Sequence, residues 1–311
     1  MKIIFAGTPR VAAYLLKGLV QSGHEVVAVL TRQDALVGRS KVLSPSEVAV
    51  AASELGIPVI KANRIGPAEV DLIVNSGAEL GVVIAYGSIL NRNALNSLSA
   101  GWYNLHFSLL PKYRGAAPVQ RALEAGESET GVTMFKLDEG MDSGLILGVT
   151  STSIGSRENY GELLNRLSAL GLKLALELLP RIYSGMTMFT EQQGEPTFAT
   201  KPTRDDARIN FNLSAGKIEH LVRAMNPEPM AWCLVGEEPM RIIEAFEVKS
   251  SALFEDMESL VAGQLCSVEG KLLVKCGEGT LLEMCEVQPS SKRVMQAKDW
   301  YNGNRNIERL T

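Results

Sequence analysis

Two polar residues that could act on one substrate stand two positions apart in the segment NLHFSLLP, which covers residues 104–111. Asn104 and His106 lie in a run with strand character, and the period of an extended chain places their side chains on the same side. A neutral imidazole can accept a proton near pH 7, and an asparagine amide can donate to an oxygen that becomes negative in a tetrahedral intermediate. The pair therefore suits acyl transfer.

A third group must orient the imidazole or share its proton. Asp142 in the segment DEGMDSG is the candidate, because Gly140 and Gly144 favour a tight turn around it. Ser108 is a competing nucleophile, but no G-x-S-x-G elbow surrounds it, which disfavours a serine hydrolase. From the residues alone, a structural histidine at a strand end is the alternative to a catalytic one.

Buried strands that alternate with helical segments must position these residues. Strand-like runs occur as KIIFA at the start of the chain, then EVVAVLT, LGVVIAYG and GWYNLHFS. This alternation predicts a Rossmann-like α/β domain with a doubly wound, mostly parallel sheet. Ligands bind such sheets beyond the carboxyl ends of the strands, which is where Asn104 and His106 fall. The first turn, FAGTPRVAA, lacks the second and third glycines of a dinucleotide-binding loop, so a dehydrogenase is disfavoured.

The length of 311 residues favours two domains over one. A long helical period at residues 158–185 is expected to close a catalytic domain that covers residues 1–186. Residues 187–206 have little apolar periodicity and are expected to be a linker. Short strands separated by turns, with one helix, predict a smaller C-terminal β-barrel domain of OB-like type at residues 207–311.

Composition excludes several classes of protein. No apolar stretch reaches the length of about 20 residues that a membrane span needs, and the N-terminus enters a strand directly, so a cytoplasmic protein is expected. The cysteines show no C-x-x-C pair and there are three histidines, so no metal site is expected. No apolar helix calls for a partner, which favours a monomer. The net charge of −4 means that a nucleic acid would have to meet a local basic patch.

The segments NLHFSLLPKYRGAAPVQRAL and GESETGVTMFKLDEGMDSG together resemble the signature of the folate-dependent formyltransferases. The resemblance continues through IIFAGTP, VVIAYGSIL, ATKPTRDDARINF and VRAMNPEP, and so covers nearly the whole chain. It implies that a formyl group carried on 10-formyltetrahydrofolate is delivered to the free amino group of methionine on initiator tRNA. The RGAAPVQRAL portion favours this acceptor.

The resemblance places the family's catalytic trio on Asn104, His106 and Asp142, which the chemistry of the residues also selects. In the implied mechanism the amine attacks the formyl carbon, Asn104 and protonated His106 stabilise the oxyanion, and Asp142 fixes the imidazole and helps to remove the proton.

The resemblance also locates the folate contacts. It assigns them to a turn with apolar side chains and exposed backbone polar groups, formed by Ser108, Leu109, Leu110 and Pro111. Leu109 and Leu110 could instead pack beneath the site. Tyr86 and Gly87, at the end of an apolar strand, are expected to line the same pocket, although Tyr86 could instead be a core aromatic residue whose hydroxyl is satisfied.

Contacts with tRNA are expected from two basic regions. The family inserts a loop after its second strand into the acceptor end of tRNA, and here Arg39 and Lys41 are the candidates. An ordinary exposed loop is the alternative. Arg114 is expected to continue the substrate wall. The C-terminal domain as a whole is acidic, but its last stretch is basic, and the expected phosphate contacts there are Lys292, Arg293 and Lys298.

Related activities share this trio and the first domain. Formyltransferases that act on amino-sugar nucleotides and formyltetrahydrofolate hydrolases are therefore alternatives that the trio does not exclude. The type of second domain and the segment AAPVQ favour tRNA. An RNA-binding module without catalysis would not need the three residues together. Glu228 in NPEP stands where the family has an aromatic residue, which puts the local packing in question.

Overall fold

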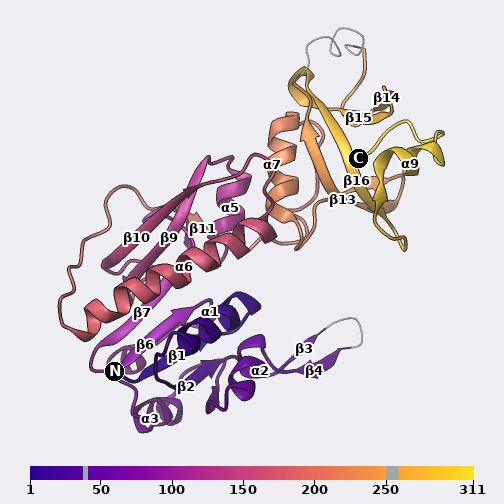
Figure 1. Cartoon of the computed structure of the whole chain (residues 1–311). Helices are drawn as coiled ribbons and strands as arrows, with labels where there is room; N and C mark the ends of the chain where they lie inside the picture. The colour runs from indigo at the N-terminus through magenta and orange to yellow at the C-terminus, as the bar shows by residue number, and fades with distance from the viewer. Residues whose placement is uncertain (38–40, 250–258) are drawn as a thin grey trace. The chain divides into compact units, whose positions relative to one another are not determined.

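The computed structural model describes residues 1–37, 41–249 and 259–311, and the chain divides into two compact units (Figure 1). The first unit comprises residues 1–118, 129–153 and 164–200, and the second comprises residues 119–128, 154–163 and 201–311. In the described part of the chain, no helix has both the length and the apolar character that crossing a bilayer requires.

The first unit is built on one seven-stranded sheet. From one edge to the other, its strands are β10 (Ile146–Ser153), β9 (Glu129–Lys136), β7 (Gly101–His106), β6 (Leu80–Ile84), β1 (Ile3–Gly7), β2 (Val26–Thr31) and β5 (Val59–Lys61). The strands from β7 to β5 are parallel to one another, and β9 and β10 continue the sheet antiparallel. This confirms the doubly wound, mostly parallel sheet.

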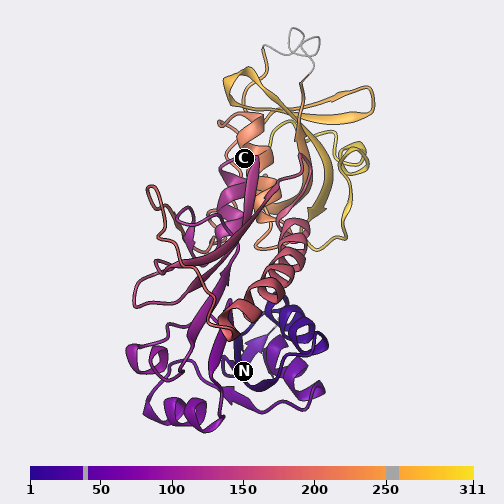
Figure 2. The same ribbon diagram turned by 60° about the vertical axis from the view of Figure 1, so that its left-hand side comes forward.

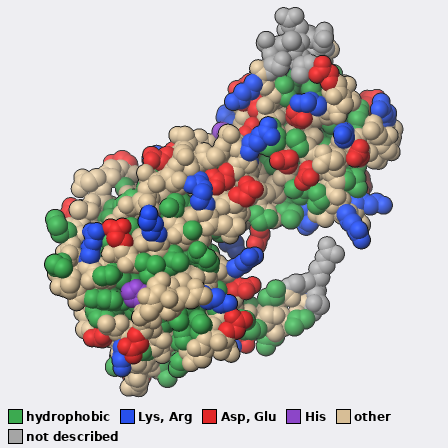
Figure 3. Space-filling model, viewed as in Figure 1, with side chains coloured by type: hydrophobic (Ala, Val, Ile, Leu, Met, Phe, Trp, Pro, Cys, Tyr) green, Lys and Arg blue, Asp and Glu red, His purple; other side chains and the backbone are tan. Residues whose placement is uncertain are grey.

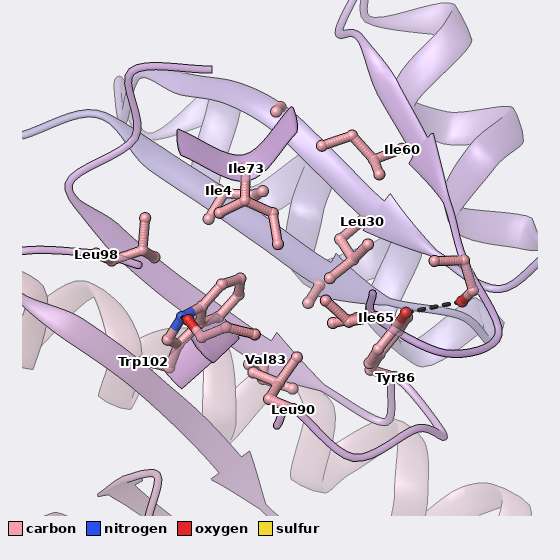
Figure 4. Close-up of a cluster of buried hydrophobic side chains, with 14 residues drawn as sticks. Ile4, Leu30, Ile60, Ile65, Ile73, Val83, Tyr86, Leu90, Leu98 and Trp102 are labelled. Carbon is pink, nitrogen blue, oxygen red and sulfur yellow. Dashed lines mark hydrogen bonds between the residues drawn. The ribbon is translucent and has the colours of Figure 1, made fainter. Parts of the chain in front are cut away.

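Helices cover both faces of the sheet (Figures 1 and 2). The helices of the first unit are α1 (Arg10–Gln21), α2 (Glu47–Glu54), α3 (Pro67–Asn75), α4 (Arg92–Leu95) and the part of α6 (Tyr160–Tyr183) that begins at Leu164. Gly18 of α1 leaves room for the side chain of Leu172 of α6, so these two helices pack closely. On the other face, Ile73 of α3 and Ala94 of α4 join a cluster of buried side chains from β1, β2, β6 and β7 (Figure 4).

The parallel strands bring their carboxyl ends to one edge. β1 lies between β2 and β6. From β2 the chain continues to β5 at one edge of the sheet, and from β6 it continues to β7 in the direction of the other edge. Hydrogen bonds join the following loops: the Thr8 hydroxyl donates to the Tyr86 carbonyl at 2.8 Å, and the Arg32 guanidinium donates to the Gly87 carbonyl at 2.6 Å. This edge is where a doubly wound sheet binds its ligand.

Two short elements accompany the sheet. The hairpin of β3 (Ala35–Val37) and β4 (Val42–Ser44) follows β2. Farther along, β8 (Arg114–Gly115) pairs in parallel with β11 (Phe198–Ala199). Residues 187–200, which lie in the segment expected to be a linker, therefore pack with the first unit.

The second unit is a curled antiparallel half-barrel with helices, which confirms a smaller β-domain (Figure 2). Its strands follow the order β12 (Trp232–Val235), β13 (Glu238–Glu247), β16 (Leu281–Pro289), β15 (Lys271–Lys275) and β14 (Leu265–Val268), and β17 (Met295–Gln296) pairs with β16. Among the described residues the unit also contains α5 (Pro118–Glu124) from Val119 onward, the first turn of α6, α7 (Ala215–Met225), a 3-10 turn (Gly277–Gly279) and α9 (Ala297–Asn302).

Side chains attach the early segments of the second unit to α7 and the residues after it. The Gln120 amide donates to the carbonyl of Ala224 at 3.3 Å and to that of Glu228 at 2.9 Å. The buried Arg223 guanidinium donates to the carbonyls of Gly155 and Glu158, both at 3.3 Å. The side chain of Glu228, which stands in NPEP where the family has an aromatic residue, is exposed. It therefore places no carboxylate in the core.

Candidate active site

Asn104 and His106 occupy the carboxyl end of β7, in the middle of the sheet. Asn104 lies opposite Phe135 of β9 and Val83 of β6. Because side chains alternate along a strand, Asn104 and His106 share the face of Trp102, which is buried in the cluster of Figure 4. Burial of Trp102 in the core thus determines the face of the sheet on which Asn104 and His106 lie.

The turn between β9 and β10 brings Asp142 to His106. The Asp142 Oδ2 atom lies 3.6 Å from His106 Nδ1, and the two side chains are 16% and 6% exposed. Their separation from bulk water strengthens the interaction between a carboxylate and an imidazolium. The structure therefore brings Asp142 and His106 together.

The backbone fixes the tautomer of His106. Its Nε2 atom lies 2.8 Å from the carbonyl oxygen of Tyr113. A carbonyl oxygen can only accept, so Nε2 carries a proton and donates it. The nitrogen that is left to take up or release a proton is Nδ1, which faces Asp142.

The turn that carries Asp142 is tightly constrained. Asp142 has a left-handed backbone with φ of 49°, and its Oδ2 accepts from the Gly115 amide at 2.7 Å. Ser143 donates to the Asp138 carboxylate at 2.9 Å, and a Cβ at Gly144 would collide with the carbonyl of Lys136. A left-handed aspartate persists only where the surroundings hold it, and these contacts do so.

Replacing Gly115 by alanine is expected to destabilise the first unit. Gly115 has φ of +121°, and an added Cβ would lie 2.8 Å from the carbonyl oxygen of Ala199. The strain is expected to cost about 1–3 kcal/mol and to displace the amide that holds Asp142. Thermal or denaturant unfolding measures the cost. Gly171→Ala, where the added Cβ would make ordinary contacts, is the control; equal stability of the two variants would contradict the expectation.

Asn104 contributes an unmet acceptor. Its Oδ1 atom is buried and has no hydrogen-bond partner among the described residues. Leaving a buried acceptor unpaired costs about 1–3 kcal/mol, so such atoms usually have a partner in the working state. A donor on a bound ligand would satisfy it.

The turn after β7 is held by its own polar groups. Ser108 is fully buried, its hydroxyl donates to the carbonyl of Lys112 at 2.6 Å, and its carbonyl accepts from the Thr133 hydroxyl at 2.7 Å. The Ser108 hydroxyl is thus committed to the turn. Leu110 and Pro111 are buried, whereas Leu109 is partly exposed.

Tyr86 lies in the core, which corrects the expectation that its ring lines the site. The ring is 2% exposed and the hydroxyl donates to the carbonyl of Ala62 at 2.7 Å (Figure 4). Burial raises the pKa of this phenol to about 12. Gly87, with φ of 78°, remains at the carboxyl edge.

The residues expected to contact tRNA lie in different structural environments. Arg39 lies outside the described residues. Lys41 is exposed and precedes β4 in the hairpin, which also exposes apolar side chains (Figure 3), namely Leu36, Val37, Val42 and Leu43.

Arg114 makes an internal contact in the first unit. Its Nε and Nη2 atoms donate to Gln192 Oε1 at 3.1 and 2.6 Å. In the second unit, exposed basic side chains lie in the turn after β16 and on α9, at Lys292, Arg293 and Lys298.

Sequence reasoning missed the groups that hold His106 and Asp142. They are the carbonyl of Tyr113, the amide of Gly115 and the side chain of Gln192. The first two are backbone groups, which every residue carries, so no residue type reveals them. Gln192 stands in a segment without periodicity. Only Gly115 has a residue type that the local backbone requires, because its φ of +121° favours glycine.

Family models match both parts of the chain. Residues 1–179 match the model described as formyl transferase, and residues 201–305 match the model described as formyl transferase, C-terminal domain.

Full-length relatives and a solved structure are also similar. The methionyl-tRNA formyltransferase of Clavibacter sepedonicus is 39% identical over 303 residues, which are 97% of each chain. That of Arthrobacter sp. (strain FB24) is 41% identical over 308 residues, 99% of this chain and 98% of the relative. The structure of an N-formyltransferase from Helicobacter canadensis, in complex with folinic acid and dTDP-3-aminofucose, has a TM-score of 0.68 at 18% identity and covers 93% of this chain and 99% of that chain. At this identity the likeness shows a common fold.

Proposed function

The chain belongs to the formyl transferase family, and from this premise we propose that it transfers the formyl group of 10-formyltetrahydrofolate to the amino group of methionine on initiator methionyl-tRNA. The product is N-formylmethionyl-tRNA, which serves translation initiation in the cytoplasm.

The observation that carries this proposal is similarity along the whole chain. Relatives named methionyl-tRNA formyltransferase share 39% and 41% identity with it across both units. The N-formyltransferase bound to dTDP-3-aminofucose shares 18%. That structure also covers 93% of this chain, so the extent of the match does not distinguish the acceptors. The much higher sequence identity to the methionyl-tRNA formyltransferases favours tRNA over an amino-sugar nucleotide.

The geometry supports distinct roles for the three residues. The methionyl amine attacks the formyl carbon, and the carbonyl oxygen becomes an oxyanion. Asn104 stabilises this oxyanion through its amide hydrogens and accepts from the attacking amine through Oδ1, the buried atom for which the described residues provide no donor. His106 takes the amine proton at Nδ1, because Nε2 is engaged by Tyr113, and Asp142 stabilises the resulting imidazolium. The oxyanion then collapses, the bond between the formyl carbon and N10 of the folate breaks, and the proton passes from His106 to N10 so that tetrahydrofolate leaves.

The residues near the trio are compatible with a folate donor. The turn from Ser108 to Pro111 presents the partly exposed Leu109 side chain beside the end of β7. A flat pterin ring needs an apolar wall and a few fixed polar groups. Folate is therefore a co-substrate of the proposed reaction, with no metal required.

The tRNA contacts are assigned by charge and exposure. Lys41, and by sequence Arg39, would meet the acceptor end, while Lys292, Arg293 and Lys298 would meet phosphates. Formyl transfer and the contact with the acceptor end are assigned to the first unit, and the phosphate contacts with tRNA are assigned to the second, in a protein that acts as a monomer. Arg114 would act through its neighbours, because its guanidinium is bound to Gln192.

The choice of acceptor tests the proposal. The protein is incubated with 10-formyltetrahydrofolate and, in parallel reactions, methionyl-tRNA, a dTDP-amino sugar or buffer alone. We expect formylation of methionyl-tRNA only. Formylation of the sugar would establish the first alternative, and release of formate in buffer at the same rate would establish a hydrolase.

A further inference from the structure

The side-chain amide of Gln192 joins two segments of the first unit. Its Nε2 atom donates to the carbonyl of Asp142 at 2.7 Å and to that of Gly144 at 3.0 Å. Its Oε1 atom accepts from two nitrogens of Arg114, at 3.1 and 2.6 Å. Both amide hydrogens and the carbonyl oxygen are therefore engaged, and Gln192 is partly buried.

The two joined segments are those that hold the catalytic pair. The carbonyl of Tyr113 accepts from His106 Nε2, and the amide of Gly115 donates to the Asp142 carboxylate. Arg114 lies between these two residues. The contact from Gln192 to Arg114 thus reaches the segment that orients His106, and the contacts to the carbonyls of Asp142 and Gly144 reach the turn that presents the carboxylate.

Both segments have backbone conformations that need support. Tyr113 has φ of 62° and Asp142 has φ of 49°. Left-handed backbone at residues other than glycine is costly and persists only where neighbouring groups hold it. Without the Gln192 amide, the Asp142 and Gly144 carbonyls lose the donors that hold the turn in place.

We propose that Gln192 is a positioning residue, which sets the separation of His106 Nδ1 and Asp142 Oδ2 by clamping residues 142–144 to Arg114. The role of Gln192 in catalysis rests on the proposed formyl transfer. Gln192 contacts neither nitrogen of His106 nor the carboxylate of Asp142, so it acts through the backbone.

Gln192→Glu is the sharpest variant, because glutamate has the same size and still pairs with Arg114, but its carboxylate cannot donate to the two carbonyls. Gln192→Ala removes both contacts, and Gln193→Ala, at the exposed neighbouring position, is the control. For the two Gln192 variants we expect kcat to fall about 10- to 100-fold with little change in KM for methionyl-tRNA, because displacements of this kind misplace reacting groups. Gln193→Ala should match the wild type.

A second substitution, at Asp142, distinguishes a positioning role of Gln192 from a merely structural one. If Gln192 acts through Asp142, Gln192→Glu should have little further effect on single-turnover rates in an Asp142→Asn background, whereas an independent role would lower the rate equally in both backgrounds. Equal lowering, or wild-type kcat in both Gln192 variants, would overturn the proposal. If Gln192→Ala does not fold, Gln192→Glu decides.

Amide hydrogen exchange tests the clamp by a measurement that does not depend on enzyme activity. In the full-length Gln192 variants, amides of a peptide that covers residues 138–146 should exchange faster than in the wild type, since the clamp on that turn is lost. Unchanged exchange would overturn the clamp. A wild-type protein that transfers no formyl group would instead refute the proposed function, and this measurement would still decide on Gln192.

Discussion

His106→Ala is expected to remove nearly all formyl transfer to methionyl-tRNA while the protein stays folded. The imidazole supplies the atom that exchanges the proton, and general acid–base catalysis typically contributes about 10²–10⁴-fold to a rate. His106 also donates to the carbonyl of Tyr113, so its loss should lower the melting temperature modestly. Single-turnover rates and thermal unfolding measure the two effects.

A second variant separates catalysis from structure. His106→Gln can still donate to the Tyr113 carbonyl but cannot act as a base near pH 7, so it should be as slow as His106→Ala and more stable. His24→Ala, which removes an imidazole bonded to the Tyr183 hydroxyl, is the control and should keep normal turnover. Normal rates in either His106 variant would refute the proposed role of the imidazole.

Asp142→Asn should slow the reaction nearly as much without disrupting the turn. The amide preserves the shape of the side chain and can still accept from Gly115, but it lacks the negative charge that stabilises an imidazolium at 3.6 Å. Two charges about 4 Å apart interact by about 4 kcal/mol at an effective dielectric of 20, which corresponds to roughly a 10³-fold lower kcat.

A nearby carboxylate provides the matched control for Asp142. Glu139 lies in the same turn but is exposed and pairs with Arg92 at the surface. Glu139→Gln should leave kcat close to the wild-type value. If Asp142→Asn retained full activity, or if both variants lost activity equally, the pairing of Asp142 with His106 would have no special part in catalysis.

Local pattern was sufficient to predict the parts of the site that depend on residue type. The alternation along the strand predicted that Asn104 and His106 share a side, and glycines around Asp142 predicted its turn. The alternation of apolar runs and helices predicted the parallel sheet, which the pairing of β5, β2, β1, β6 and β7 confirms.

The remaining features depend on contacts between distant residues. A tyrosine at the end of an apolar strand suits a pocket or a core equally, and only the position of Ala62 decides for Tyr86. Residues 187–200 lack periodicity, yet β11 pairs with β8 and Gln192 holds the turn of Asp142. Such contacts leave no local pattern, because one polar side chain and two backbone carbonyls suffice to make them.

The most direct test of formyl transfer at this site follows a labelled formyl group to its acceptor atom. Wild-type protein and a doubly substituted Asn104→Ala, His106→Ala variant are each given formyl-labelled 10-formyltetrahydrofolate and methionyl-tRNA in a single turnover, and the aminoacyl ester is then hydrolysed. We predict labelled N-formylmethionine from the wild type and none above the uncatalysed level from the variant, with both proteins folded. Label that stays in folate or appears as formate with the wild type, or equal product from the variant, would contradict this account.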